Sequence, residues 1–180
     1  DMVIEFTSTS KISFPGAGVA AIAASHRNIE IIKKRMSVQT IGYDKINQYR
    51  HVKFYKDVDG IKRHMKLHKE ILAPKFKAVI DAFENGLGEY GIAHWSKPNG
   101  GYFISLDVLP GTAKRVGELC KEGGVTLTTV GATFPYGIDP EDKNIRIAPS
   151  YPPVNELLEA TRLLCICVRL AAVELILKTK

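Results

Sequence analysis

The sequence has few cysteines, no long apolar segment and no leader-like start. Three cysteines occur among 180 residues, a sparse and odd number that excludes a disulfide scaffold and is typical of the cytosol. No apolar run approaches the length that spans a bilayer, and the first residues lack the basic start and apolar stretch of a signal peptide. We therefore expect a cytoplasmic protein that does not bind membranes.

Positive charge is in excess but is not gathered in one tail. Lys and Arg number 25 against 19 Asp and Glu, which gives a formal net charge of +6. The densest basic stretch, residues 53–69, is typical of a solvated helix face, because runs of charge usually face water. Hydrophobic residues make up 45% of the chain, which is enough for a core. These features favour a globular protein that does not bind nucleic acid.

The start of the chain predicts a strand without any lead-in element. Residues 3–6 are strand-like from the outset, and a buried strand needs neighbours that pair with its backbone groups. We expect that an upstream portion is missing, and that residues 3–11 lack full sheet partners or pair with a neighbouring chain. Residues 18–24 predict a strand buried on both faces, as in a parallel sheet, and Ser25 is expected to cap the next helix.

The rest of the chain predicts helices on a small sheet. Apolar residues recur at helical spacing over 61–85, where Pro74 should kink the helix. We interpret residues 1–55 as the tail of one α/β domain and residues 56–180 as a second, small α/β domain. The cysteines are interpreted as small packed hydrophobes. The later elements are expected to be a hairpin at 92–95 and 101–108, a helix between 112 and 124, strands at 125–130 and 144–148, and a helix after 152–153.

A lysine flanked by hydroxyl groups is the first candidate functional residue. Lys11 follows the first predicted strand, with Ser8 and Ser10 before it and a Pro-Gly turn after it. A strand end would hold the amine rigidly as a nucleophile and base, and the serine hydroxyls could donate hydrogen bonds to a phosphate. His64 and His68 share a helix face, but no third ligand is evident, so we predict no metal site.

The lysine segment resembles the cofactor-lysine region of the aspartate-aminotransferase superfamily, which is fold type I of the pyridoxal-phosphate-dependent enzymes. The resemblance covers essentially the whole chain. It implies an α/β fold, the C-terminal portion of the pyridoxal-phosphate-dependent transferase fold, with the small domain at 56–180 and the tail of the large domain at 1–55. Three later segments resemble the family in the right order: Lys97-Pro98-Asn99-Gly100-Gly101-Tyr102-Phe103, Val130-Gly131-Ala132-Thr133-Phe134 and Asn144-Ile145-Arg146-Ile147-Ala148.

The resemblance implies an aminotransferase that moves an amino group between an amino acid and a 2-oxo acid through a pyridoxal-phosphate Schiff base. Lys11 would form that bond, and Ser8 and Ser10 would help to bind the cofactor. Arg146 would orient the substrate carboxylate, because a guanidinium can donate two parallel hydrogen bonds to it. The family also implies a homodimer.

One departure from the family concerns the cofactor phosphate. The family usually has an arginine for this phosphate where Gly18 stands here, so Arg27, Lys33 or an upstream residue is left to neutralise it. The family's acidic partner of the pyridine nitrogen and its glycine-rich phosphate grip would also lie upstream. We therefore expect the isolated chain to be inactive or nearly so.

Two alternative functions remain open for the same lysine. Some transcription regulators carry an aminotransferase-like sensing domain behind a helix-turn-helix domain, although nothing in this chain resembles a helix-turn-helix. A fold-type-I lyase or decarboxylase would use the lysine equally well. The sequence does not identify the amino acid donor.

Overall fold

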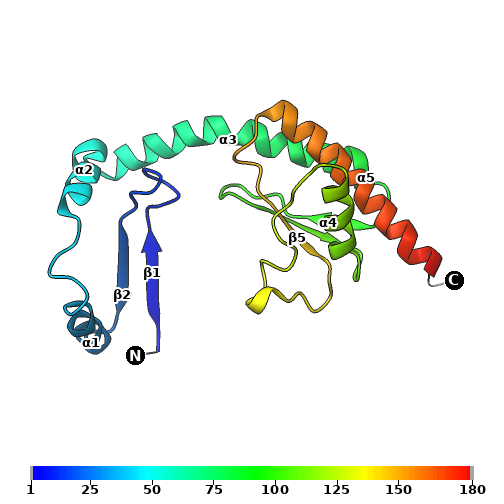
Figure 1. Ribbon diagram of the computed structural model, residues 1–180. Helices are drawn as coiled ribbons and strands as arrows, with labels where there is room; N and C mark the ends of the chain where they lie inside the picture. Colours follow the sequence, from blue (N-terminus) through cyan, green and yellow to red (C-terminus); the bar gives the residue numbers. More distant parts are fainter. Residues whose placement is uncertain (1, 179–180) are drawn as a thin grey trace. The chain divides into compact units, whose positions relative to one another are not determined.

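The computed structural model describes residues 2–178 and divides the chain into two compact units, residues 1–68 and 69–180 (Figure 1). Helix α3 (Val58–Leu87) contributes its first residues to the first unit and the remainder to the second. The assignment of residues 1–55 to the tail of a large domain stays a prediction. No helix within residues 2–178 is both long and apolar enough to cross a membrane.

A two-stranded sheet opens the first unit. Strand β1 (Ile4–Ser8) pairs antiparallel with β2 (Ala20–Ala24). The residues of β1 are exposed and those of β2 are exposed or half-buried, so the prediction of a doubly buried strand in a parallel sheet is wrong. The reason is that this unit has too few elements to cover either face of the sheet. Within the described residues β1 pairs only with β2, which agrees with the expectation of an incomplete set of sheet partners.

Two helices follow in the first unit. Helix α1 (His26–Met36) begins where predicted, and the Ser25 hydroxyl accepts a hydrogen bond from the Asn28 N–H at 3.4 Å. Helix α2 (Lys45–Tyr55) was not predicted, because its apolar side chains do not form one stripe. The Asp44 carboxylate accepts a hydrogen bond from a backbone N–H of the first turn at 2.8 Å. This N-cap is the local signal that could have revealed the helix.

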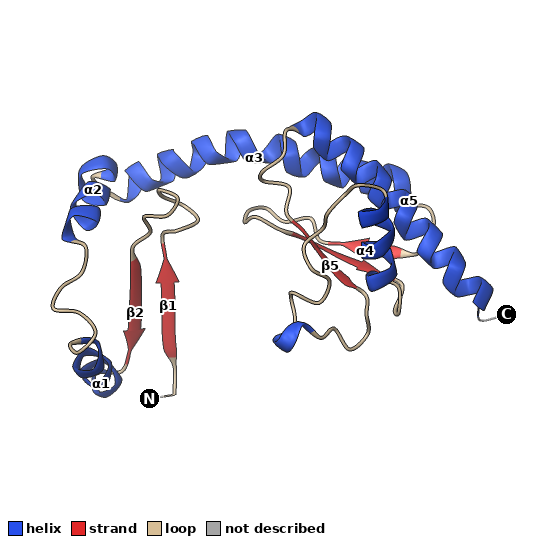
Figure 2. Ribbon diagram, viewed as in Figure 1, coloured by secondary structure: helices blue, strands red, loops and turns tan. Residues whose placement is uncertain are grey.

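The second unit contains a three-stranded antiparallel sheet in the order β3-β4-β5 (Figure 2). The strands are β3 (Ala93–Trp95), β4 (Ile104–Val108) and β5 (Asn144–Ile147). The predicted hairpin and the strand predicted at 144–148 are confirmed. Helices α4 (Ala113–Glu122) and α5 (Val154–Lys178) are also confirmed, at 112–124 and after 152–153.

One face of this sheet forms the core of the second unit with the helices. Along β4, Leu106 and its alternate neighbours are buried, whereas Ser105 and Asp107 point to the other face. The helix residues that join the core include one aromatic ring, Phe83, which is fully buried. The cysteines are buried in this core, as expected for small packed hydrophobes: Cys120, Cys165 and Cys167.

The segment at 125–130 was predicted as a strand and is not one. Its apolar side chains are half-buried against the core, but the segment pairs with no strand: Val125, Leu127 and Val130. A short 3-10 helix, η1 (Pro135–Gly137), follows before β5.

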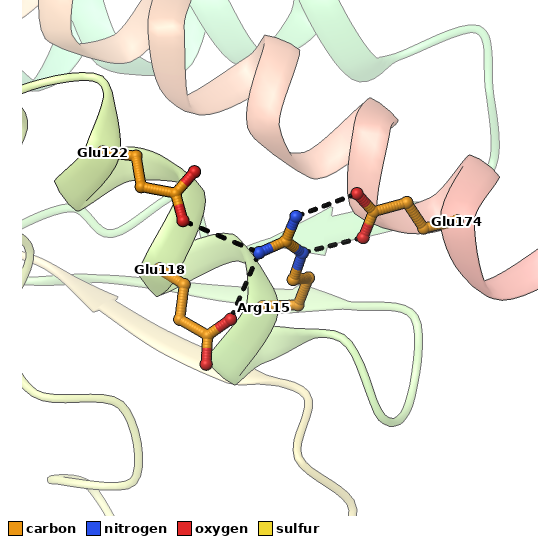
Figure 3. A network of polar contacts seen from close by, with 4 residues as sticks. All are labelled: Arg115, Glu118, Glu122 and Glu174. Atoms are coloured by element: carbon orange, nitrogen blue, oxygen red, sulfur yellow. Dashed lines mark hydrogen bonds and ion pairs between the residues drawn. The ribbon is translucent and has the colours of Figure 1, made fainter.

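An ion-pair network joins α4 to α5 on the surface of the second unit (Figure 3). The Arg115 guanidinium donates two hydrogen bonds to the Glu174 carboxylate, at 2.7 and 3.0 Å, and pairs with Glu118 at 3.3 Å. The hydrogen bond from Arg115 holds the pKa of Glu174 below its usual range. Glu122 completes the network at 3.9 Å.

Candidate functional site

Lys11 lies in a turn between the two strands of the first unit. This turn, Thr9–Ser13, begins directly after β1 and is called the lysine turn below. The Thr9 carbonyl accepts hydrogen bonds from the N–H groups of Ile12 at 2.9 Å and Ser13 at 2.8 Å. The Lys11 side chain is exposed, so a ligand can approach it.

The lysine turn is anchored to the start of β2. The Thr9 N–H donates to the Val19 carbonyl, and the Val19 N–H donates to the Thr9 hydroxyl, both at 2.8 Å. These bonds extend the pairing of Ser8 with Ala20 by one residue pair. The base of the turn is therefore continuous with the sheet.

Ser8 and Ser10 form a hydroxyl pair at the start of the lysine turn. Their Oγ atoms are 2.7 Å apart, and the Ser10 N–H donates to the Ser8 Oγ at 3.1 Å. The pair carries two hydroxyl protons, and the bond between the two oxygens uses one of them. The other proton can be donated to an anionic oxygen, so the hydroxyls fit a phosphate group next to Lys11.

Gly18 packs directly against this hydroxyl pair. A Cβ atom at Gly18 would collide with the Ser10 Oγ and lie 3.0 Å from the Ser10 Cα. An arginine at this position could not be accommodated without moving Ser10. Any side chain at position 18 would therefore require Ser10 to shift.

The two basic residues considered as replacements differ in their position. Arg27 lies just after the end of β2 that pairs with Ile4, the far end of the sheet from the lysine turn (Figure 1). Four strand residues span roughly 13 Å, so Arg27 is badly placed for a group bound at Lys11. Lys33 lines the same cleft as Gly18, of about 530 Å³, and pairs with Glu30 at 3.1 Å.

Helix α2 contacts the lysine turn through side chains that the sequence did not reveal. His51 Nε2 lies 3.0 Å from the Ser13 Oγ, and the Asn47 amide donates to the Ala17 carbonyl at 2.9 Å. The Phe14 ring packs edge-on against the His51 ring, with centroids 5.1 Å apart. No local pattern could indicate these contacts, because they join residues about 30 to 40 positions apart in the sequence.

Arg146 lies on the polar face of the sheet in the second unit. It is opposite Ser105 in the β4–β5 register, and its guanidinium carbon lies 4.6 Å from the centre of the Phe103 ring. The Arg146 Nε is buried and has no hydrogen-bond partner among the described residues. A buried N–H without a partner is costly, so this donor requires an acceptor that the described residues do not supply.

A hydrogen-bond network fixes the strand that carries Arg146. The Asn144 amide donates to the Ser105 Oγ at 2.8 Å and to the Asp107 carboxylate at 2.6 Å, and the Thr133 hydroxyl donates to the Asn144 amide oxygen at 2.7 Å. Thr133 comes from one of the segments that resemble the aminotransferases. The network sets the register of β5 on β4, and therefore the position of Arg146.

Asp139 holds the start of the same strand. Burial alone would raise the pKa of Asp139, but hydrogen bonds from the N–H groups of Asn144, Lys143 and Glu141 hold it below its usual range. The ionised carboxylate therefore holds the backbone of residues 141–144 in place.

Of the predicted site residues, Ser8, Ser10 and Lys11 lie in the first unit, and Arg146 lies in the second.

The fold of both units is found in the C-terminal part of pyridoxal-phosphate-dependent aminotransferases. A solved structure of an aspartate transaminase from Corynebacterium glutamicum matches 94% of this chain with a TM-score of 0.91 and 48% identity. An α-aminoadipate aminotransferase from Thermus thermophilus matches with a TM-score of 0.74 and 18% identity, a likeness that shows the fold alone. The matches cover 40% and 42% of those chains.

The chain belongs to the aspartate aminotransferase family, since the model of that family matches residues 1–180. It is 50% identical over 175 residues to a protein of Mycolicibacterium smegmatis named as an aminotransferase, and 48% identical over 169 residues to an aspartate aminotransferase of Corynebacterium glutamicum. The alignments cover 97% and 94% of this chain. The chain spans only 41% and 39% of the length of these relatives.

Proposed function

We propose that this chain is part of an aminotransferase that uses pyridoxal phosphate to move an amino group from an amino acid to a 2-oxo acid. In this proposal Lys11 holds the cofactor covalently, Ser8 and Ser10 donate hydrogen bonds to it, and Arg146 binds the substrate carboxylate. Family membership supports the class of reaction. The roles of the individual residues rest on the geometry of each unit.

The observation that carries the proposal is the state of Arg146. Its Nε is buried without a partner among the described residues, while the guanidinium lies over the Phe103 ring. A carboxylate that accepts from Nε and from a terminal N–H would satisfy the buried donor with a two-point contact. Such a contact would orient an amino acid as well as bind it.

The lysine turn supplies the groups that a covalent cofactor needs. Lys11 is exposed and follows the Ser8–Ser10 hydroxyl pair directly in the sequence, so one short segment offers both a nucleophile and phosphate donors. When bound, pyridoxal phosphate supplies an electron sink for the electrons left behind when the substrate α-proton departs. Lys11 would accept that proton at the substrate Cα, as a general base. The family resemblance further suggests a cytoplasmic homodimer.

The absorption spectrum of the full-length protein that contains this chain, recorded with pyridoxal phosphate, tests this proposal. We expect a band of bound cofactor that changes when an amino acid is added and returns when a 2-oxo acid is added. A spectrum that is the sum of free cofactor and protein, and that ignores both substrates, would contradict it. A change without transfer of the amino group would instead favour a lyase or a sensing domain.

A further inference from the structure

The lysine turn is fastened to helix α2 by a chain of hydrogen bonds. The Ser13 hydroxyl lies 3.0 Å from His51 Nε2, 2.9 Å from the Thr9 carbonyl and 3.0 Å from the Thr9 hydroxyl. His51 Nδ1 lies 2.8 Å from the Asn47 carbonyl of the same helix. These hydrogen bonds therefore link the backbone of α2, through His51 and Ser13, to Thr9, whose carbonyl accepts the two backbone hydrogen bonds of the lysine turn.

The acceptors in this series of hydrogen bonds indicate which atoms carry the protons. A carbonyl oxygen only accepts, so the contact with Asn47 requires a proton on His51 Nδ1. In a neutral ring Nε2 then has no proton, so the contact at 3.0 Å requires the Ser13 hydroxyl to donate to it. The Ser13 hydroxyl has a single proton, and the Thr9 carbonyl at 2.9 Å and the Thr9 Oγ at 3.0 Å are the other acceptors within its reach. His51 therefore competes with Thr9 for the Ser13 proton.

Burial makes the loss of the hydrogen bond between His51 and Ser13 costly. Ser13 is 5% exposed and His51 is 9% exposed, whereas Lys11 two residues before Ser13 is exposed. Water cannot readily replace a lost partner in the buried part of the chain. The Phe14 ring, which packs on His51 and on Phe54 with centroids 5.1 Å apart in both cases, covers the link from the side.

We propose that His51 is a positioning residue for Lys11, acting through the Ser13 hydroxyl to fix the lysine turn. The catalytic importance of this role rests on the proposed function. The hydrogen bonds among His51, Ser13 and Thr9 do not depend on that function. Helix α2 also holds the far side of the same loop, through the Asn47 amide and the Ala17 carbonyl. Helix α2 therefore holds the loop at two positions that follow Lys11, Ser13 and Ala17.

The first test is the protonation state of the His51 ring, measured by nitrogen NMR on the protein without cofactor. We expect the neutral ring to carry its proton on Nδ1, as the contact with the Asn47 carbonyl requires. A neutral ring protonated on Nε2 would overturn the proposal. This measurement needs no substitution, so it stands even if a variant fails to fold.

The second test is hydrogen exchange of the Ile12 and Ser13 amides, the two donors that close the lysine turn. His51→Phe keeps a ring beside Phe14 but loses both nitrogens, and Ser13→Ala loses the hydroxyl. We expect each variant to exchange these amides roughly two- to tenfold faster, the factor that one hydrogen bond contributes. The double variant should exchange no faster than either single variant. Unchanged rates, or effects that multiply in the double variant, would overturn the proposal.

His64→Phe is the matched control. The His64 ring lies in the same aromatic cluster, 6.4 Å from the Phe14 ring, and its Nε2 has no partner among the described residues. We expect exchange in the lysine turn to stay within twofold in this variant. Acceleration equal to that of His51→Phe would assign the effect to the cluster as a whole and refute the specific link.

Cofactor trapping on the same variants separates this proposal from the proposed function. If borohydride traps pyridoxal phosphate on Lys11, the rate of trapping should fall in His51→Phe and Ser13→Ala and not in His64→Phe. Equal trapping rates in the unsubstituted protein and the three variants would contradict a positioning role for His51. If no label reaches Lys11 in the unsubstituted protein, the proposed function fails, while the tautomer and the exchange rates still decide the link between His51 and the lysine turn.

Discussion

The two units differ in what holds them together. In the first unit the buried side chains are few, and they are polar or aromatic: Ser13, His51 and Tyr55. In the second unit an apolar core joins one face of the sheet to three helices. The comparison indicates that the first unit depends on a few polar and aromatic contacts near Lys11. In the second unit an apolar core adds to the polar network that fixes the strand with Arg146.

The largest expected effect is a loss of transamination activity caused by a substitution in the first unit. Lys11→Ala removes the amine that would hold the cofactor and move the proton, so transamination by the full-length protein should fall by several orders of magnitude. The thermal unfolding of the second unit should not change, because Lys11 is exposed and lies outside its core. Residual activity above a tenth of the unsubstituted level would remove Lys11 from the proposed role.

The same substitution made in both units should show the contrast in stability. Phe83 is fully buried and contacts the Trp95 ring, with centroids 5.5 Å apart, so Phe83→Ala should cost about 3–5 kcal/mol of unfolding free energy. Phe6 is 73% exposed, so Phe6→Ala should change it by less than about 0.5 kcal/mol. Urea unfolding of both variants checks the pair. Equal losses would mean that the two units do not differ as described.

Arg146→Lys tests the substrate role in the second unit. Lysine keeps the positive charge but loses the two-point contact, so kcat/KM for amino acids should fall by about 1–3 kcal/mol of transition-state stabilisation. Arg162→Lys is the control, since Arg162 is exposed and pairs with Glu159 at 2.9 Å. Steady-state kinetics that show the same efficiency for both variants would place Arg146 among surface arginines.

The buried thiols predict a loss of stability at high pH in the second unit. Burial, with the neighbouring Cys167, raises the pKa of Cys120 from 9.0 to about 12, and burial raises that of Cys165 to about 11. Because the folded pKa values lie above the ordinary value, the neutral thiols stabilise the fold below pH 9 and this contribution is lost as pH rises toward 12.

The urea midpoint measured between pH 8 and pH 11 checks this expectation. Cys120→Ala should lower the midpoint at pH 8 and flatten its decline with pH, because alanine has no thiol to titrate. A decline that is as steep in Cys120→Ala as in the unsubstituted protein would assign the alkaline loss to other groups.

The smallest expected effect concerns the surface network of the second unit. Arg115 contacts Glu174 with two hydrogen bonds, but its side chain is 37% exposed, so screening by water and salt limits what the pair contributes. Arg115→Gln should lower the melting temperature less than Phe83→Ala does, and the difference should shrink in 1 M salt. A salt-independent loss would indicate that packing of the arginine stem dominates.

The sequence predicted the parts of the fold that depend on local signals. The helix cap at Ser25, the hairpin of β3 and β4, and the strand with Arg146 were expected from capping residues, turn chemistry and alternation. The same reasoning wrongly predicted a strand at 125–130. Apolar side chains of this segment pack on the core, but its backbone pairs with no strand. It missed α2, whose apolar residues surround the helix and whose clearest signal is the cap at Asp44.

The candidate site was only partly predictable for the same reason. Ser8, Ser10 and Lys11 are neighbours in the sequence, so the amino-acid sequence alone was enough to recognise their pattern. The His51 contact with Ser13 spans 38 residues, and it depends on the position of α2, which the sequence did not indicate. The packing of Gly18 on Ser10 likewise became evident only from the geometry.

Mapping of borohydride-trapped cofactor tests the central claim most directly. The full-length protein would be incubated with pyridoxal phosphate, reduced, digested and analysed by mass spectrometry. Lys33 is the internal comparison, because it lines a cleft beside the sheet of the first unit and pairs with Glu30. The account predicts a single reduced label on Lys11 and its loss in Lys11→Ala. A label on Lys33 or any other lysine, or no label at all, would contradict it.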